Sequence, residues 1–114
     1  MVAGNDLIVA IWEELAEAER WRNLGKEGRA RVCARRAAGW AVQYYIENRL
    51  EESTHLNAYQ LLNWFRSRLD APQALKEAAD RLCTRVTPAG ILPYSQDPLQ
   101  DAQAIVEAIL SGQP

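Results

Sequence analysis

The stretch KEGRARVCARRAAGWAVQYYIENRL, residues 26–50, decides the fold of this chain. It is rich in alanine, basic at its start and aromatic toward its end, and it predicts one long helix. A helical projection gives this helix two apolar faces with arginines between them. The broad face holds Ala30, Cys33, Ala34, Ala37, Trp40, Ala41, Tyr44 and Tyr45, and the narrow face holds Val32, Gly39, Ile46 and Leu50. Such a helix either lies at the centre of a bundle or also takes part in self-association.

An amphipathic helix is predicted before this stretch. Asn5 and Asp6 are good N-terminal caps, and apolar residues recur at helical spacing from Leu7 to Ala18. Gly25 is expected to end this helix, because glycine readily adopts the left-handed conformation that follows a helix C-terminus.

Three more helices are predicted after the central one. Their expected ranges are 56–69, 70–86 and 97–111. The caps expected for them are Ser53 or Thr54 for the first, and capping boxes at Asp70 and Asp97 for the other two. The inner face of the first is expected to hold Leu61, Leu62, Phe65 and Leu69. The sequence shows no strand-like alternation, so the predicted fold is all-α, an antiparallel bundle of about five helices in one domain over residues 1–114.

The four tryptophans are expected to serve the core and an interface. Trp12, Trp40 and Trp64 fall on or near the inner faces of their helices, which predicts that they are buried. Trp21 lies off the main apolar face of its helix and is a candidate anchor for a partner.

Positive charge is concentrated in the central helix. The chain of 114 residues has a net charge of −2, which excludes a generic nucleic-acid binder. Residues 26–50 hold six basic and two acidic residues, a local charge of +4 in a chain whose remainder carries −6. Such an asymmetry can attract a polyanion or an acidic partner. The alternative is a solvated face whose arginines pair with acidic residues of the first helix.

Other classes of site and location have little support in the sequence. Cys33 and Cys83 lie among apolar residues and are predicted to be free thiols without metal-ligand spacing, so neither a metal nor another cofactor is expected. No apolar run approaches the length of a membrane span, and the N-terminus lacks the features of a signal peptide. We therefore expect a cytoplasmic protein that does not insert into a membrane.

One pair of residues could carry chemistry on phosphodiesters. Arg49 can hold a phosphate bidentately, and the imidazole of His55, the only histidine, can act as general acid or base near neutral pH. Tyr44, Tyr45 and the arginines nearby could hold the rest of a nucleotide or an RNA. The alternative is a structural histidine that hydrogen-bonds the backbone at a helix boundary.

Three segments resemble one family. They are ARRAAGWAVQYYIENRL over 34–50, HLNAYQLL over 55–62, and PYSQDPLQDAQAIVEAIL over 93–110. Over residues 7–110 the chain resembles HEPN domains, small helical bundles often encoded beside minimal nucleotidyltransferases. The resemblance implies a homodimer, a nucleotidyltransferase as partner protein, and either an RNase-type toxin or a non-catalytic module that associates with nucleotides or nucleic acid.

The resemblance also bears on catalysis. Catalytic members carry an arginine, four to six residues and then a histidine, a spacing that Arg49 and His55 meet. However, Leu50 stands where a polar residue usually follows the arginine, and the pair comes early, before the helix that follows. These departures favour a member that binds without cleaving.

The leading expectation is therefore a homodimeric, HEPN-like binding module. Its basic helix would face a nucleotide, an RNA or other nucleic acid, or an acidic protein. The residues expected to bind are Arg29, Arg31, Arg35, Arg36, Tyr44 and Tyr45. One alternative is a metal-independent endoribonuclease that uses Arg49 and His55, and another is a helical adaptor without a nucleic-acid role.

Overall fold

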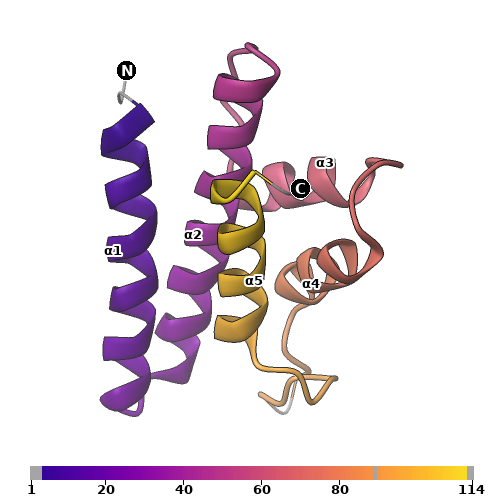
Figure 1. Ribbon diagram of the computed structural model, residues 1–114. Helices are drawn as coiled ribbons and strands as arrows, with labels where there is room; N and C mark the ends of the chain where they lie inside the picture. The colour runs from indigo at the N-terminus through magenta and orange to yellow at the C-terminus, as the bar shows by residue number, and fades with distance from the viewer. Residues whose placement is uncertain (1–3, 89, 113–114) are drawn as a thin grey trace.

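The protein is a bundle of five helices arranged around the second one. The computed structural model describes residues 4–88 and 90–112, and within these ranges it contains no strand. The helices are α1 (Gly4–Asn23), α2 (Glu27–Arg49), α3 (Ala58–Arg66), α4 (Gln73–Cys83) and α5 (Pro98–Leu110). α2 contacts each of the other four helices, as Figure 1 shows. The predicted all-α bundle with a long central helix is confirmed.

The direction of each helix follows from the connections. Gly25, at a φ of 76°, ends α1 as predicted, and the Lys26 N–H donates to the Trp21 carbonyl, so that α2 turns back antiparallel to α1. α5 instead runs parallel to α2 (Figure 1), and Arg49 near the end of α2 donates to the Ile109 carbonyl near the end of α5. This direction is possible because α3 and α4 intervene and lie to one side of the other helices (Figure 1).

The two apolar faces of α2 are largely covered by other helices, although Val32 on the narrow face is 41% exposed. Tyr45 of the broad face lies beside Trp64 of α3, and the narrow face meets α3 at Gly39. At Gly39 a Cβ atom would lie 2.9 Å from both the Cα and the Cβ of Ala58, so α3 begins directly against the middle of α2. Ile46 is buried as well. The pattern therefore reflects a central position, and Gly39 and Ile46 are not available for self-association.

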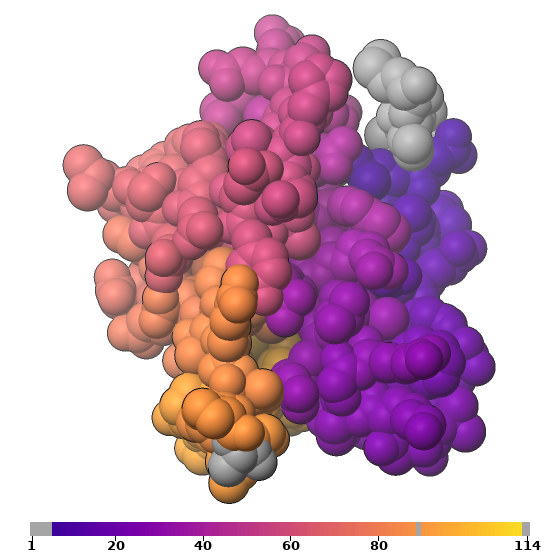
Figure 2. Space-filling model, turned by 180° about the vertical axis from the view of Figure 1, so that it is seen from behind, coloured from indigo at the N-terminus to yellow at the C-terminus, as the bar shows by residue number. Residues whose placement is uncertain are grey.

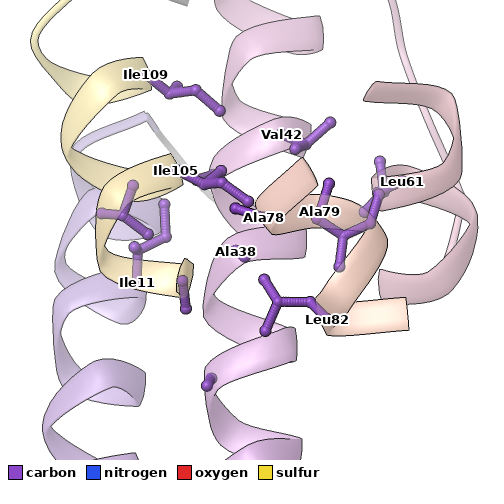
Figure 3. Close-up of a cluster of buried hydrophobic side chains, with 14 of the residues drawn as sticks. Ile11, Ala38, Val42, Leu61, Ala78, Ala79, Leu82, Ile105 and Ile109 are labelled. Carbon is purple, nitrogen blue, oxygen red and sulfur yellow. The ribbon is translucent and has the colours of Figure 1, made fainter. Parts of the chain in front are cut away.

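The core is built where large side chains from the outer helices meet the alanines of α2 and α4. Figure 3 shows Ile11 of α1, Leu61 of α3 and Ile105 of α5 converging on Ala38 and Ala79. The largest fully buried side chains are Phe65, Ile11, Leu61, Leu62, Ile105, Ile109, Val42 and Val106. Small residues on the central helix let its neighbours approach closely, which keeps this interior dense.

The ends of α3 differ from the prediction. α3 is capped by Asn57, whose side chain accepts from the Gln60 N–H while the Gln60 side chain accepts from the Asn57 N–H. This reciprocal capping box satisfies two helix-end donors, so Ser53 and Thr54 are not the caps. The helix ends at Arg66, and Leu69, predicted on the inner face, is 98% exposed in the turn beyond it.

The caps of α4 and α5 give one correction and one confirmation. Asp70 was expected to cap α4, but its carboxylate pairs with Arg68 and Pro72 stands at the cap position without a side-chain hydrogen bond. Asp97 caps α5 as predicted, with its carboxylate accepting from the Leu99 N–H at 3.0 Å, but Gln100 does not complete the predicted capping box.

The tryptophans lie at the edge of the core, not in its centre. Trp12 is 43% exposed, so the prediction that it is buried was wrong. The inner face of α1 is centred on Ile11, and the next residue along a helix points about 100° away from it. Trp40 and Trp64 are half-buried against the core, and so is Trp21.

Candidate anion-binding site

The first turns of α2 form one wall of a pocket of about 450 Å³. Arg31 and Arg35, one helical turn apart, lie on this wall, and Arg85 reaches the pocket from the segment just after α4. Tyr59 of α3 and Tyr94, which precedes α5, complete the polar lining. Figure 2 shows the hollow between the start of α2 and the segment that follows α4. We call it the arginine pocket.

Arg35 is held in place on two sides. Its Nε donates to the Leu82 carbonyl at 3.1 Å, an oxygen in the last turn of α4 that the helix itself leaves without a partner. Its guanidinium carbon lies 4.4 Å from the centre of the Tyr59 ring. Among the described residues, both terminal amino groups of Arg35 have no hydrogen-bond acceptor. They are therefore two fixed donors that a ligand could use.

The charge of the arginine pocket is not neutralised by the described part of the chain. Ion pairs occupy Arg20, Arg22, Arg36, Arg66, Arg68 and Arg81. Within the parts of the chain that the structure describes, Arg31, Arg35 and Arg85 have no carboxylate within 4.0 Å, and no Asp or Glu lines the pocket. Three unpaired guanidiniums around one concavity concentrate positive potential there.

The wall opposite α2 is fixed by polar contacts. The Tyr94 hydroxyl donates to the Arg81 carbonyl at 2.9 Å, and burial together with the nearby Asp101 charge raises the pKa of Tyr94, so its phenol stays neutral. Arg81 in turn holds the buried Asp101 through two hydrogen bonds of 2.8 Å. This pair joins α4 to α5 and keeps the side of the pocket in place.

A second basic hollow, of about 420 Å³, lies across α2 from the arginine pocket. It is lined by Trp21, Gly28, Arg29, Val32, Cys33 and Arg36, and we call it the Trp21 hollow. The Arg29 guanidinium lies 4.7 Å from the centre of the Trp21 ring. Arg36 pairs with Glu14 of α1 at 2.7 Å, as the alternative of a solvated, ion-paired face predicts.

The six residues predicted to bind are thus divided among three places. Arg31 and Arg35 line the arginine pocket, and Arg29 and Arg36 line the Trp21 hollow. The two tyrosines line neither. Tyr44 packs against the core, and Tyr45 lies 6.3 Å from Trp64 between ring centres, with the Arg49 and Arg68 guanidiniums 5.8 and 5.3 Å from its own ring.

Arg49 and His55 are not joined by a hydrogen bond. Arg49 Nη2 donates to the Ile109 carbonyl at 2.9 Å, a contact that holds α2 to α5. His55 is exposed in the connection 50–57, and neither residue lines the arginine pocket or the Trp21 hollow. The alternative of a backbone-bonded histidine is also without support, since no side-chain hydrogen bond of His55 to a described residue is present.

Three residues of the arginine pocket were not predicted. Tyr59 lies in α3, whereas Arg85 and Tyr94 both lie in the connection between α4 and α5, and no motif marked these three side chains as part of a site. The available signal was weak. Arg85 is a basic residue near the end of the helix predicted over 70–86, which in the structure ends at Cys83, and Tyr94 is an aromatic residue in a loop. Their meeting depends on how α3, α4 and α5 pack around α2.

The described residues were also searched for a metal site and a membrane span, and the chain was compared with known proteins. Among residues 4–88 and 90–112 no group of His, Cys, Asp and Glu could hold a metal ion, and no helix is long and apolar enough to cross a membrane. Cys33 and Cys83 are free, and burial raises the pKa of both thiols. Comparison with protein-family models, curated proteins and solved structures finds no match for this chain.

Proposed function

We propose that this chain is a HEPN-like helical binding module that holds a phosphate group of a nucleotide or nucleic acid in the arginine pocket. The observation that carries the proposal is the meeting of Arg31, Arg35 and Arg85 around one concavity without a carboxylate partner among the described residues. Guanidinium groups bind phosphate through parallel, charge-assisted hydrogen bonds.

The pocket also suits the remainder of a nucleotide. Its volume of about 450 Å³ lies in the usual range for small-molecule sites. Apolar atoms of Val32, Leu82, Val86 and Pro98 stand beside the arginines and could cover a sugar or a base. Because Tyr59 and the Leu82 carbonyl already hold Arg35, a ligand would lose little side-chain entropy in binding to it.

The proposal is tested by titrating the protein with adenosine, AMP and ADP in a calorimeter. We expect AMP and ADP to bind and adenosine not to bind, because the arginines recognise the phosphate. Arg35→Ala or Arg85→Ala should weaken AMP binding about tenfold or more, which is the usual effect of losing a hydrogen bond to a charged group. Lys76→Ala removes the same charge outside the pocket and should leave affinity unchanged.

Two results would contradict the proposal. If neither nucleotide binds, or if the Arg35 and Lys76 variants weaken binding equally, the pocket is not the site. Binding to an acidic protein or the adaptor role would then be the remaining proposals for α2.

The endoribonuclease alternative is tested separately. The sequence spacing of Arg49 and His55 favours it, and the exposed imidazole of His55 is open to a large substrate. Cleavage of a mixed RNA pool in the presence of EDTA, lost in His55→Ala, would support it. A protein that binds nucleotides and leaves RNA intact would support the binding module alone.

The HEPN-like assignment carries further proposals on assembly. It implies a homodimer and a nucleotidyltransferase as a partner protein, and we also propose a cytoplasmic location. The exposed Val9 and Trp12 on α1 are apolar residues that such an interface could cover. Light scattering at micromolar concentration tests the homodimer, and a monomer would argue against it.

A further inference from the structure

The arginine pocket and the Trp21 hollow share one wall. Gly28 and Val32, on the first two turns of α2, line both of them. The two hollows therefore adjoin along a low ridge of α2, which we call the crest. It is formed by Gly28, which has no side chain, and by Val32, which is partly exposed. Basic side chains stand on both sides of this crest.

The low crest is not required by the fold. A Cβ atom at Gly28 would meet nothing nearer than 3.8 Å, where the Arg31 side chain lies, and the residue has no left-handed backbone. Gly39 on the same helix differs, because there the contact with Ala58 excludes any side chain. Glycine inside a helix is unfavourable relative to alanine, so Gly28 has a stability cost without a packing reason.

Arg29, in the Trp21 hollow, has a positive charge that a ligand could use. Among the described residues it has no carboxylate within 4.0 Å, whereas Arg36 beside it pairs with Glu14. The Arg29 guanidinium lies over the Trp21 ring. Arg20 also lies over this ring, so the Arg29 plane, and not the ring, is the surface on which a nucleobase could stack.

We propose that the ligand crosses α2 over Gly28 and Val32 and places phosphates in both hollows, so that it is a single-stranded nucleic acid and not a mononucleotide. This inference rests on the proposed function of the arginine pocket. Arg29 and Arg31 are two positions apart, so they point to nearly opposite sides of a helix that is about 10 Å across with its side chains, a separation that one phosphate or a diphosphate cannot bridge. A chain of phosphodiesters spans this width, and the missing side chain at Gly28 lets it pass close to the helix.

The experiment measures binding of labelled oligothymidylates of about 4 to 16 nucleotides, beside AMP, over a series of salt concentrations. We expect the oligonucleotides to bind at least tenfold more tightly than AMP. Arg29→Ala should weaken oligonucleotide binding about tenfold and leave AMP binding unchanged. It should also reduce the slope of log K against log salt by about 0.7, the contribution of one phosphate on a single strand.

Further variants distinguish a failure of the proposed crossing over α2 from a failure of the arginine pocket itself. Arg29→Lys keeps the charge and should keep the salt slope, and Arg35→Ala should weaken both ligands. If Arg29→Ala behaves like Lys76→Ala while Arg35→Ala still weakens AMP, the crossing is wrong and the pocket stands. If Arg35→Ala changes neither ligand, the proposed function itself fails.

Discussion

The contact between Gly39 and Ala58 allows the packing of α3 on α2 to be tested by adding a single methyl group. In Gly39→Ala the new Cβ would lie 2.9 Å from the Cα and the Cβ of Ala58, whereas carbon atoms in favourable contact are about 3.5–4.0 Å apart. Neither Ala58 atom can rotate away, so α3 or α2 must shift by roughly the difference.

Two opposing contributions decide whether Gly39→Ala stabilises or destabilises the protein: helix propensity and overpacking. Alanine is favoured over glycine inside a helix by about 1 kcal/mol. Overpacking a dense core by one methyl group costs about 1–3 kcal/mol. We therefore expect Gly39→Ala to lower the free energy of unfolding by up to about 2 kcal/mol.

Gly28→Ala is the matched control, because it is the same substitution in the same helix. Its Cβ would have open space, with the nearest atom 3.8 Å away, so the variant should be more stable than the wild type by at most about 1 kcal/mol. Urea unfolding of both variants without ligand, followed by circular dichroism and tryptophan fluorescence, measures the difference and tests whether the transition is two-state.

A result in which Gly39→Ala is as stable as Gly28→Ala would refute the close approach of α3 to α2. Ala58→Gly added to Gly39→Ala refines the test. It removes the Cβ contact but leaves the Ala58 Cα at 2.9 Å, so it should restore only part of the lost stability.

Three further outcomes are expected. The hydrogen bond from Arg22 lowers the pKa of Asp97 in the folded protein. The stability that this pair contributes is therefore complete above the unfolded pKa of about 3.9, and it is lost as the pH falls through the lower folded pKa. Asp97→Asn should reduce the loss of Tm on acidification, and an unchanged Tm profile would show that this pair contributes nothing. Leu69→Ala should change the free energy of unfolding by less than about 0.5 kcal/mol, whereas Leu62→Ala, at a buried site, should cost about 2–5 kcal/mol in urea unfolding; similar costs would place Leu69 in the core. His55→Ala should leave AMP affinity unchanged by calorimetry, because His55 does not line the arginine pocket, and a large loss of affinity would contradict the location of the site.

Local signals predicted some helix ends and failed at others, among them the start of α1, where Asn5 and Asp6 lie inside the helix, and the places where two signals competed. Gly25 and Asp97 act through atoms within a few residues, so their roles were visible in the sequence. At the start of α3 three polar residues could have served as cap, and Asn57 does so because Gln60 completes its capping box. Asp70 matched a capping pattern equally well, but pairing with Arg68 two residues earlier engages its carboxylate instead.

The candidate site was predictable only in part. The basic character of α2 and the choice of Arg31 and Arg35 came from the sequence, since both lie on one side of a helical projection. Arg36 showed the same character and was predicted equally, yet Glu14 of α1 neutralises it. Whether an arginine stays available depends on which acidic residue of another helix lies opposite it.

By itself the sequence determined a five-helix bundle, the central place of α2 and the concentration of positive charge on it, because periodicity and capping act within one helix. Only the tertiary structure decided that Arg85 joins Arg31 and Arg35 around one pocket, and that Trp12 lies outside the core. The physical reason is that the crossing of two helices is set by contacts between them. Here the approach of Ala58 to Gly39 places the start of α3 against the middle of α2, and α4, which Arg85 follows, packs against α3.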